Sequence, residues 1–386
     1  PFFPFMLLAV GVGAAALTVH RQKQAAAARE AAEEAAPAKA EDEPAAMLAM
    51  DDLRIELGYG LLPLISEDDA TGKRLPDQIR AVRRAIAQEL GFVTPAVRIL
   101  DNMSLGANDY VIRLKEQDVA RGSLRPGFFL VMNPTGGAVS LVGEMTKDPA
   151  FGLDAMWIDA GQKDEAGLKG YTVVDAATVL TTHLTEIIKS EAPDLLSYAE
   201  TKKLIDALPD KHRNLVSDLI PNVATVTTVQ RVLQTLIAER ISIRDLPSIL
   251  EAVAEAAPTL KTAGAITEHV RARLSRQICG DLKSADGSVP IVTLSADWDA
   301  AFSENIIGQG DDRQLALAPS RLQEFVAEAL KMLEEAASAG HAAAIVASPG
   351  VRPFVRSVME RVRPQTPVLS QNEIHPHARL LNLGRI

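Results

Sequence analysis

The residues that could support catalysis in this chain are few and lie far apart. Cys279 is the single cysteine, and as a nucleophile it would need a base and an orienting partner, which no motif around it supplies. His375 and His377 could share one face of a strand and hold a metal, but no third ligand type clusters nearby, and we interpret them as part of a solvated tail. Ser348-Pro349-Gly350 precedes a predicted helix without the Lys-Ser/Thr pair of a phosphate loop. We therefore expect no enzyme, no metal site and no cofactor.

A binding surface is a better candidate, and it lies between Gly143 and His183. Asp148 and Pro149 begin a turn that is followed at once by Phe151, and Trp157 follows in a short apolar segment. A β-branched run then changes into helical spacing that includes Thr182. This order is typical of the floor of an apolar cleft, although an ordinary turn beside core aromatic residues would have the same pattern. His183 is interpreted as a packed or capping residue.

Composition limits the classes of protein to which the chain can belong. Its 386 residues are enough for two to four compact units. A formal net charge of −10 argues against a nucleic-acid partner, because phosphate backbones select basic surfaces. One cysteine excludes an internal disulfide and indicates a reducing compartment. Aromatic residues make up only 4%, so the cores must consist mostly of Ala, Val, Ile and Leu.

The first 20 residues differ from the rest of the chain. Residues 2–19 are almost uninterrupted apolar sequence and would span roughly 27 Å as a helix. A signal peptide is the alternative, but no positive charge precedes the run, and Arg21 and Lys23 follow it. We expect residues 1–20 to be the end of a last transmembrane helix, with the following residues in the cytoplasm. The Ala-, Glu- and Pro-rich segment 21–50 is then a linker.

Alternating and helical patterns indicate mixed structure up to about residue 190. Strands are predicted around residues 53–57, 97–99, 110–114 and 128–132. The apolar stripe from Ile79 to Leu90 predicts a helix that stops before Gly91, and a second helix is predicted over 178–188.

Two further regions complete the chain. Residues 193–278 have the spacing of a helical bundle, with an apolar stripe from Val229 to Ile237 and a start signal at Asp245. Beyond it, strands are predicted at 290–294, 343–347 and 367–370, and helices at 322–337 and 351–362. This β-α-β-α-β order predicts a small, mostly parallel sheet.

Several motifs in one order resemble the FlhA/InvA family of type III secretion export gates, in the cytoplasmic region of those proteins. The resemblance runs from about residue 58 to about 270. Its motifs are Gly58-Tyr59, Leu62-Pro63, Ile79-Arg80, Gln88-Glu89-Leu90-Gly91-Phe92, Asp101-Asn102-Met103, Asn133-Pro134, Asp148-Pro149-Ala150-Phe151-Gly152-Leu153, Gly170-Tyr171-Thr172-Val173-Val174 and Ile243-Arg244-Asp245.

The resemblance implies an α+β multidomain fold of four small units after the transmembrane end and the linker. The insertion of the second unit into the first is implied by the family alone. The expected units are a mixed α+β unit (51–126 and 176–195), an inserted small α+β unit (127–175), a helical unit (196–276) and a C-terminal α/β unit (277–386).

The resemblance also implies a function without chemistry. Such a protein is a docking platform of the flagellar export gate, and a cleft between the first and inserted units receives export chaperones that carry substrates. The matching positions are Asp148, Phe151 and Thr182, with Val174 and Val179 on the same wall. Phe151 would be an aromatic anchor and Asp148 a charged or capping contact.

Gly58 and Pro134 match family positions linked to conformational control. The expected partners are flagellar export chaperones with their substrates, other export-apparatus proteins including the ATPase complex, and further copies of the chain in a nine-membered ring at the bacterial inner membrane. Two alternatives remain open. One is a membrane-tethered α/β enzyme that binds a nucleotide or metabolite through its last unit, and the other is an export gate of a virulence injectisome.

Overall fold

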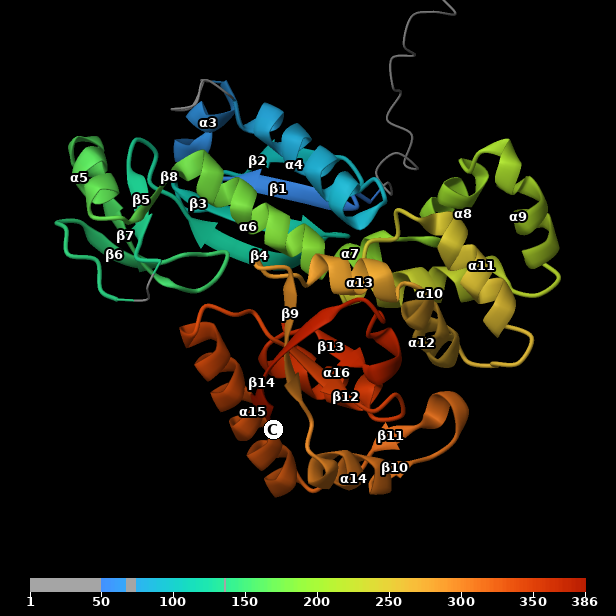
Figure 1. The fold of residues 1–386 in the computed structure, drawn as a ribbon. Helices are drawn as coiled ribbons and strands as arrows, with labels where there is room; N and C mark the ends of the chain where they lie inside the picture. Colours follow the sequence, from blue (N-terminus) through green and yellow to red (C-terminus); the bar gives the residue numbers. More distant parts are fainter. Residues whose placement is uncertain (1–49, 67–73, 135–136) are drawn as a thin grey trace, which may run out of the picture. The chain divides into compact units, whose positions relative to one another are not determined.

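The computed structural model describes residues 50–66, 74–134 and 137–386. The predicted transmembrane end and almost all of the predicted linker therefore lie outside the described residues. Asp52–Ile386 forms one compact unit. Its described residues contain three four-stranded sheets and a two-stranded ladder, combined with helices (Figure 1). This mixed architecture confirms the predicted α+β class.

The first sheet has the strand order β2-β1-β3-β4, with β1 parallel to β2 and antiparallel to β3. Helix α4 ends as predicted, because Gly91 caps it with a left-handed φ of 92°. Figure 1 shows α4 and α6 side by side across one face of this sheet. The elements are β1 (Leu53–Leu57), η1 (Tyr59–Leu61), α3 (Pro63–Ser66), α4 (Leu75–Leu90), β2 (Val97–Asp101), β3 (Asp109–Leu114), β4 (Gln117–Ser123) and α6 (Ala176–Ser190).

The second sheet is antiparallel throughout, with the order β6-β7-β5-β8. Asp175 ends its last strand and begins α6, because its carboxylate accepts the Thr178 backbone N–H at 2.7 Å. The chain therefore passes directly from this sheet back to the first one. The elements are β5 (Phe129–Met132), β6 (Glu144–Lys147), β7 (Asp154–Ile158), η2 (Ala160–Gln162), α5 (Lys163–Leu168) and β8 (Thr172–Asp175).

The next segment is helical, as predicted. The stripe from Val229 to Ile237 is buried in α10, and Asp245 caps α11 by accepting the Ser248 backbone N–H. The elements are α7 (Ala192–Leu195), α8 (Tyr198–Asp206), η3 (Asp210–His212), α9 (Arg213–Leu219), α10 (Val226–Ala238), α11 (Leu246–Ala256), α12 (Ala263–Arg273) and α13 (Ser275–Asp281).

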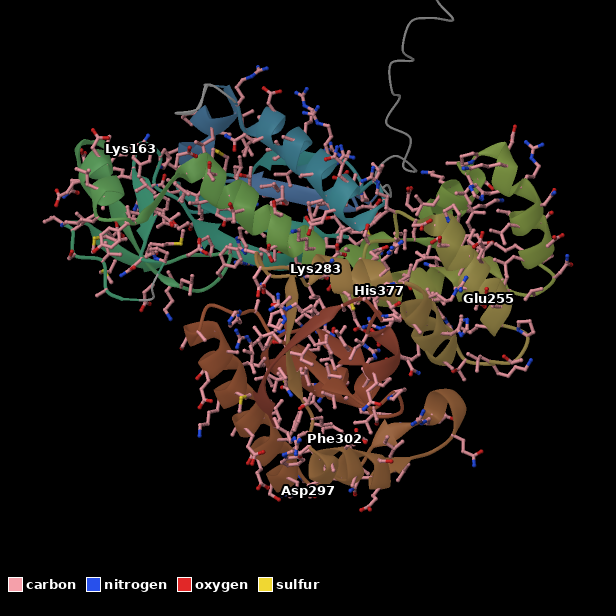
Figure 2. All side chains as sticks on the ribbon, viewed as in Figure 1. Lys163, Glu255, Lys283, Asp297, Phe302 and His377 are labelled. Carbon is pink, nitrogen blue, oxygen red and sulfur yellow. The ribbon has the colours of Figure 1, made fainter. Side chains whose placement is uncertain are left out.

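The C-terminal sheet has the order β13-β12-β9-β14, and all of its pairings are parallel. Phe302, which Figure 2 labels, meets the ring of Phe325 edge to face at 4.9 Å and joins α14 to α15 in a core of its own. The elements are β9 (Ser288–Thr293), α14 (Ala296–Glu304), β10 (Ile306–Ile307), η4 (Gly310–Asp312), β11 (Gln314–Leu315), α15 (Pro319–Ser338), β12 (Ala344–Ala347), α16 (Arg352–Val362), β13 (Val368–Ser370), η5 (Gln371–Glu373) and β14 (Arg379–Arg385).

The interpretation of the chain's end was partly wrong. His375 and His377 precede β14 in a loop rather than sharing the face of a strand. The solvated tail that we predicted is in fact followed by β14, which pairs with β9. Strand β14 is an edge strand with few buried positions, so its sequence lacks the apolar alternation on which the prediction depended.

A buried network of charges connects the helical segment to the C-terminal sheet. Arg352 of α16 donates to Glu268 of α12 at 2.8 Å and to Glu239 at the end of α10 at 2.7 Å. Arg271 of α12 donates to Glu239 at 2.8 Å and also to Glu373 of η5. Arg271 and Arg352 are each only 2% exposed. Burial raises the pKa of Glu268, and the attraction of Arg352 opposes this shift.

Candidate functional site

The Asp148 loop, which we define as residues 148–153 between β6 and β7, closes on itself. The Asp148 backbone N–H donates to the Leu153 carbonyl, and the Gly152 N–H donates to the Asp148 carbonyl, both at 2.8 Å. The Asp148 carboxylate accepts the Phe151 backbone N–H, also at 2.8 Å. Asp148 is only 3% exposed, whereas Phe151 is 50% exposed. The buried carboxylate therefore fixes a turn that keeps an aromatic ring half in solvent.

The charge of Asp148 influences the pKa values of a buried pair, Tyr110 and His183. The Tyr110 hydroxyl of β3 lies 2.6 Å from Nδ1 of His183 in α6. Burial raises the pKa of Tyr110 above its usual range, and the Asp148 charge raises it further. Burial lowers the pKa of His183, and the Asp148 charge opposes that shift. The Asp148 charge therefore influences both groups of this buried pair.

The predicted site residues differ in what they expose. Thr182 directly precedes His183 on α6 and is half-buried. Val174, opposite Leu130 in the second sheet, is also half-buried. Val179 is only 2% exposed and belongs to the main core. The side chains of Phe151, Thr182 and Val174 are thus accessible to a partner. Asp148 and Val179 are buried and can contribute only by positioning neighbouring residues.

Gly58 is required by close packing. Its backbone N–H donates to the Asp109 carbonyl at 2.8 Å, and its φ of −65° is one that any residue can adopt. A Cβ at this position would lie 2.0 Å from the carbonyl oxygen of Gly106, so a larger side chain would force the backbone apart. Pro134 is exposed in the turn after β5.

The residues considered for chemistry contact other groups of the protein. Cys279 is buried, with its sulfur 3.3 Å from both the Glu373 carbonyl oxygen and the His375 nitrogen. The Ser348 backbone N–H donates to the Asp299 carboxylate at 3.2 Å, so a carboxylate occupies the place where a phosphate would bind. Within the described part of the chain, no group of three or more His, Cys, Asp or Glu side chains is arranged to hold a metal.

Sequence reasoning missed the partner of His183. It predicted correctly that His183 is packed, but Tyr110 lies 73 positions earlier and no spacing rule connects the two. The one local signal is Gly122, which pairs with Tyr110 across β3 and β4. A Cβ at Gly122 would lie 2.5 Å from the Tyr110 hydroxyl oxygen, so this strand leaves room for the phenol.

The fold and this loop define a member of the FHIPEP family, and the chain belongs to it, because the family model matches residues 1–379. This confirms the predicted family and extends the resemblance at both ends. The chain is 54% identical over 389 residues to the flagellar biosynthesis protein FlhA of Caulobacter vibrioides, covering 100% of this chain and 55% of that protein. It is 37% identical over 338 residues to FlhA of Bacillus subtilis, covering 88% of this chain and 50% of that protein. The chain thus spans about half the length of the curated relatives it matches.

Solved structures share the fold. The Chlamydia pneumoniae CdsV protein aligns with a TM-score of 0.77 at 24% identity, over 88% of this chain and 98% of that one. Nonameric EPEC SctV-C aligns with a TM-score of 0.72 at 20% identity, over 88% of this chain and 99% of that one. At these identities the likeness supports the fold alone. Among the residues that the structure describes, no helix has the length and apolar character needed to cross a membrane.

Proposed function

We propose that this chain is the docking platform of a flagellar type III export gate, at the bacterial inner membrane with the residues after about 20 in the cytoplasm. Family membership supports the export role, and relatives named flagellar biosynthesis protein FlhA favour the flagellar branch over an injectisome. The proposal includes a nonameric ring and contacts with export-apparatus proteins such as the ATPase complex. Two structural neighbours support this part of the proposal, because EPEC SctV-C is a nonamer and Chlamydia pneumoniae CdsV forms a complex with CdsO.

The observation that carries the docking role is the Asp148 loop. Phe151 and Leu153 of this loop are 50% and 54% exposed, and the turn that exposes Phe151 is fixed by a buried carboxylate. Neighbouring exposed apolar side chains of this kind favour a binding surface. We propose that a chaperone covers Phe151, with Thr182 and Val174 supplying the rest of the contact. Asp148 acts by holding the loop, and Val179 by supporting α6 from the core. Export chaperones with their substrates are therefore the proposed partners.

We further propose that the chain is divided into the four predicted units. In it, Gly58 and Pro134 are conformational positions and not contacts. Gly58 suits this role because it packs directly against the Gly106 carbonyl, so a change there is transmitted through the backbone. The ranges of the units are 51–126 with 176–195, 127–175, 196–276 and 277–386.

Phe151→Ala tests the docking role. We expect chaperone affinity to fall by about 2 kcal/mol, roughly thirtyfold in Kd, measured by titration calorimetry with a flagellar chaperone–substrate complex. Phe128→Ala is the matched control, because Phe128 is 44% exposed directly before β5 of the same sheet but lies outside the Asp148 loop. Equal affinities for wild type and Phe151→Ala would rule out the proposed face.

The alternative of an enzyme rests on the C-terminal sheet. A cavity of about 500 Å³ is lined by residues that follow its strands, including Ser295, Ser348 and Gln371, and this edge is where parallel sheets bind ligands. The Asp299 carboxylate that accepts the Ser348 N–H works against a nucleotide phosphate there. A thermal shift with ATP or GTP would favour the enzyme, and we expect none.

A further inference from the structure

A groove of about 800 Å³ lies between α12, the β10–β11 hairpin and α16. Its lining residues come from three separate segments of the chain, within residues 260–268, 310–322 and 349–361. None of them belongs to the Asp148 loop or to the predicted chaperone-binding residues. The groove is therefore a second surface, independent of the proposed docking face.

The floor of the groove is apolar. Leu315, Leu322 and Phe354 line it, and each is partly buried against the C-terminal core. Leu260 also lines the groove and packs partly on the main core. These side chains keep open apolar surface that another molecule could cover, and helical segments recognise such surfaces through aliphatic anchors spaced along one face.

The groove is also positively charged, in a chain with a net charge of −10. Arg313 and Arg361 line it and are exposed. The Arg313 guanidinium lies over the Phe354 ring at 5.2 Å, which places the cation directly above the apolar floor. Glu268 is the one acidic residue among the described lining residues, and Arg352 already neutralises it.

The N-terminus of α12 adds to this potential. Thr262 caps the helix by accepting the Ala265 backbone N–H, and the first turn contains no acidic residue that would offset the helix dipole. Gly264 is exposed, lines the groove and has open space where a Cβ would lie. A ligand can therefore approach the backbone of this first turn closely.

We propose that this groove docks an acidic amphipathic segment of a partner protein. Aliphatic side chains of the segment would cover Leu315 and Phe354, while its carboxylates would pair with Arg313 and Arg361. Charge complementarity supports an acidic partner, since the only acid among the described lining residues is already paired. A macromolecular segment fits better than a small ligand, because a space of about 800 Å³ open to three chain segments is near the upper end for small-molecule sites.

The test measures fluorescence anisotropy of a labelled amphipathic peptide of Leu, Ala and Glu, long enough for about five helical turns, against the whole chain in mild detergent. A peptide with Lys in place of Glu is the comparison. We expect the acidic peptide to bind more tightly, and Arg313→Glu to weaken it about tenfold or more. Arg321→Glu is the matched control: Arg321 is also exposed and stacked on an aromatic ring, that of Trp298 at 4.5 Å, but does not line the groove.

Several results would overturn the proposal. Equal binding of the two peptides, or an equal loss with Arg321→Glu, would show a general charge effect. Displacement of the peptide by inorganic phosphate at constant ionic strength would indicate a small-anion site. If Arg313→Glu changes the sedimentation of the chain without peptide, the groove is an interface between copies. Phe151→Ala should leave peptide binding unchanged, so failure of this proposal is distinct from failure of the chaperone face.

Discussion

The Asp148 loop and the Arg352 network both bury charged side chains, and they use them in different ways. The Asp148 carboxylate accepts a backbone N–H of its own loop, and the result is an exposed Phe151. In the network, Arg352 donates to both Glu239 and Glu268, which belong to separate elements. The first arrangement presents a surface to a partner, whereas the second holds distant parts of the chain together. Substitutions in the loop should therefore change chaperone affinity, and substitutions in the network should change the free energy of unfolding.

The largest effect should come from the network. Arg352→Ala removes a buried arginine that pairs with the largely buried Glu239 and the half-buried Glu268. Removing one member of a buried ion pair costs about 3–5 kcal/mol of the free energy of unfolding. Urea denaturation followed by circular dichroism measures this loss. The chaperone affinity of the fraction that remains folded should not change.

Arg213→Ala is the control for that measurement, since Arg213 pairs with Asp210 at the surface. Exposed pairs contribute only about 0–1 kcal/mol. If Arg352→Ala costs no more than Arg213→Ala, the network does not hold the helical segment to the C-terminal sheet. If it instead reduces chaperone affinity in the folded protein, the two regions are coupled and the contrast between them is wrong.

A smaller effect is expected at the Tyr110–His183 pair, where a substitution should change both the free energy of unfolding and the chaperone affinity. Tyr110→Phe leaves Nδ1 of the buried His183 without its hydrogen-bond partner, at a cost of about 1–3 kcal/mol in the free energy of unfolding. Because the Asp148 charge acts on both groups of this pair, we also expect a lower chaperone affinity.

Tyr171→Phe removes a hydroxyl that bonds to Ser140 near the surface, and it should change stability by less than about 0.5 kcal/mol. Calorimetry and urea denaturation on both variants separate the two effects. Loss of stability with full chaperone affinity in Tyr110→Phe would show that the pair supports the core and not the loop.

The two regions also differ in how far the sequence could predict them. The strand at Leu53–Leu57 and the helix that Gly91 ends follow from local periodicity and a local cap, and both are as predicted. The resemblance selected Asp148 and Phe151, but only the folded chain reveals that one is buried and the other exposed. That distinction depends on how the folded chain packs around the loop, which the local pattern of residues does not contain.

The network gave no signal at all. Arg271 and Arg352 lie on helices whose charged residues look solvated, and their partners are between 16 and 113 positions away or in other elements. The polar edge strands β4 and β14 were missed for a related reason, since pairing on one side leaves many of their side chains exposed. Periodicity reports burial along one element, and these features depend on contacts between elements.

The smallest expected effect is a dependence of stability on pH. Burial lowers the pKa of His183 in the folded chain, so the unfolded chain, in which its pKa is about 6.5, takes up the proton first. Stability should therefore fall as pH drops below about 6.5 and level off below the folded pKa, with a slope of at most about 1.4 kcal/mol per pH unit. His183→Gln should remove this pH-dependent component of stability from urea denaturation series, and His212→Gln, outside the pair, should retain it.

Asp148→Asn tests the cause of this pH dependence further, because the Asp148 charge opposes the lowering of the His183 pKa. Without that charge the folded pKa falls further, and the loss of stability should continue to lower pH. An unchanged pH profile in Asp148→Asn would mean that the Asp148 charge does not influence the pKa of His183. The Asp148 loop would then be electrostatically independent of the buried Tyr110–His183 pair.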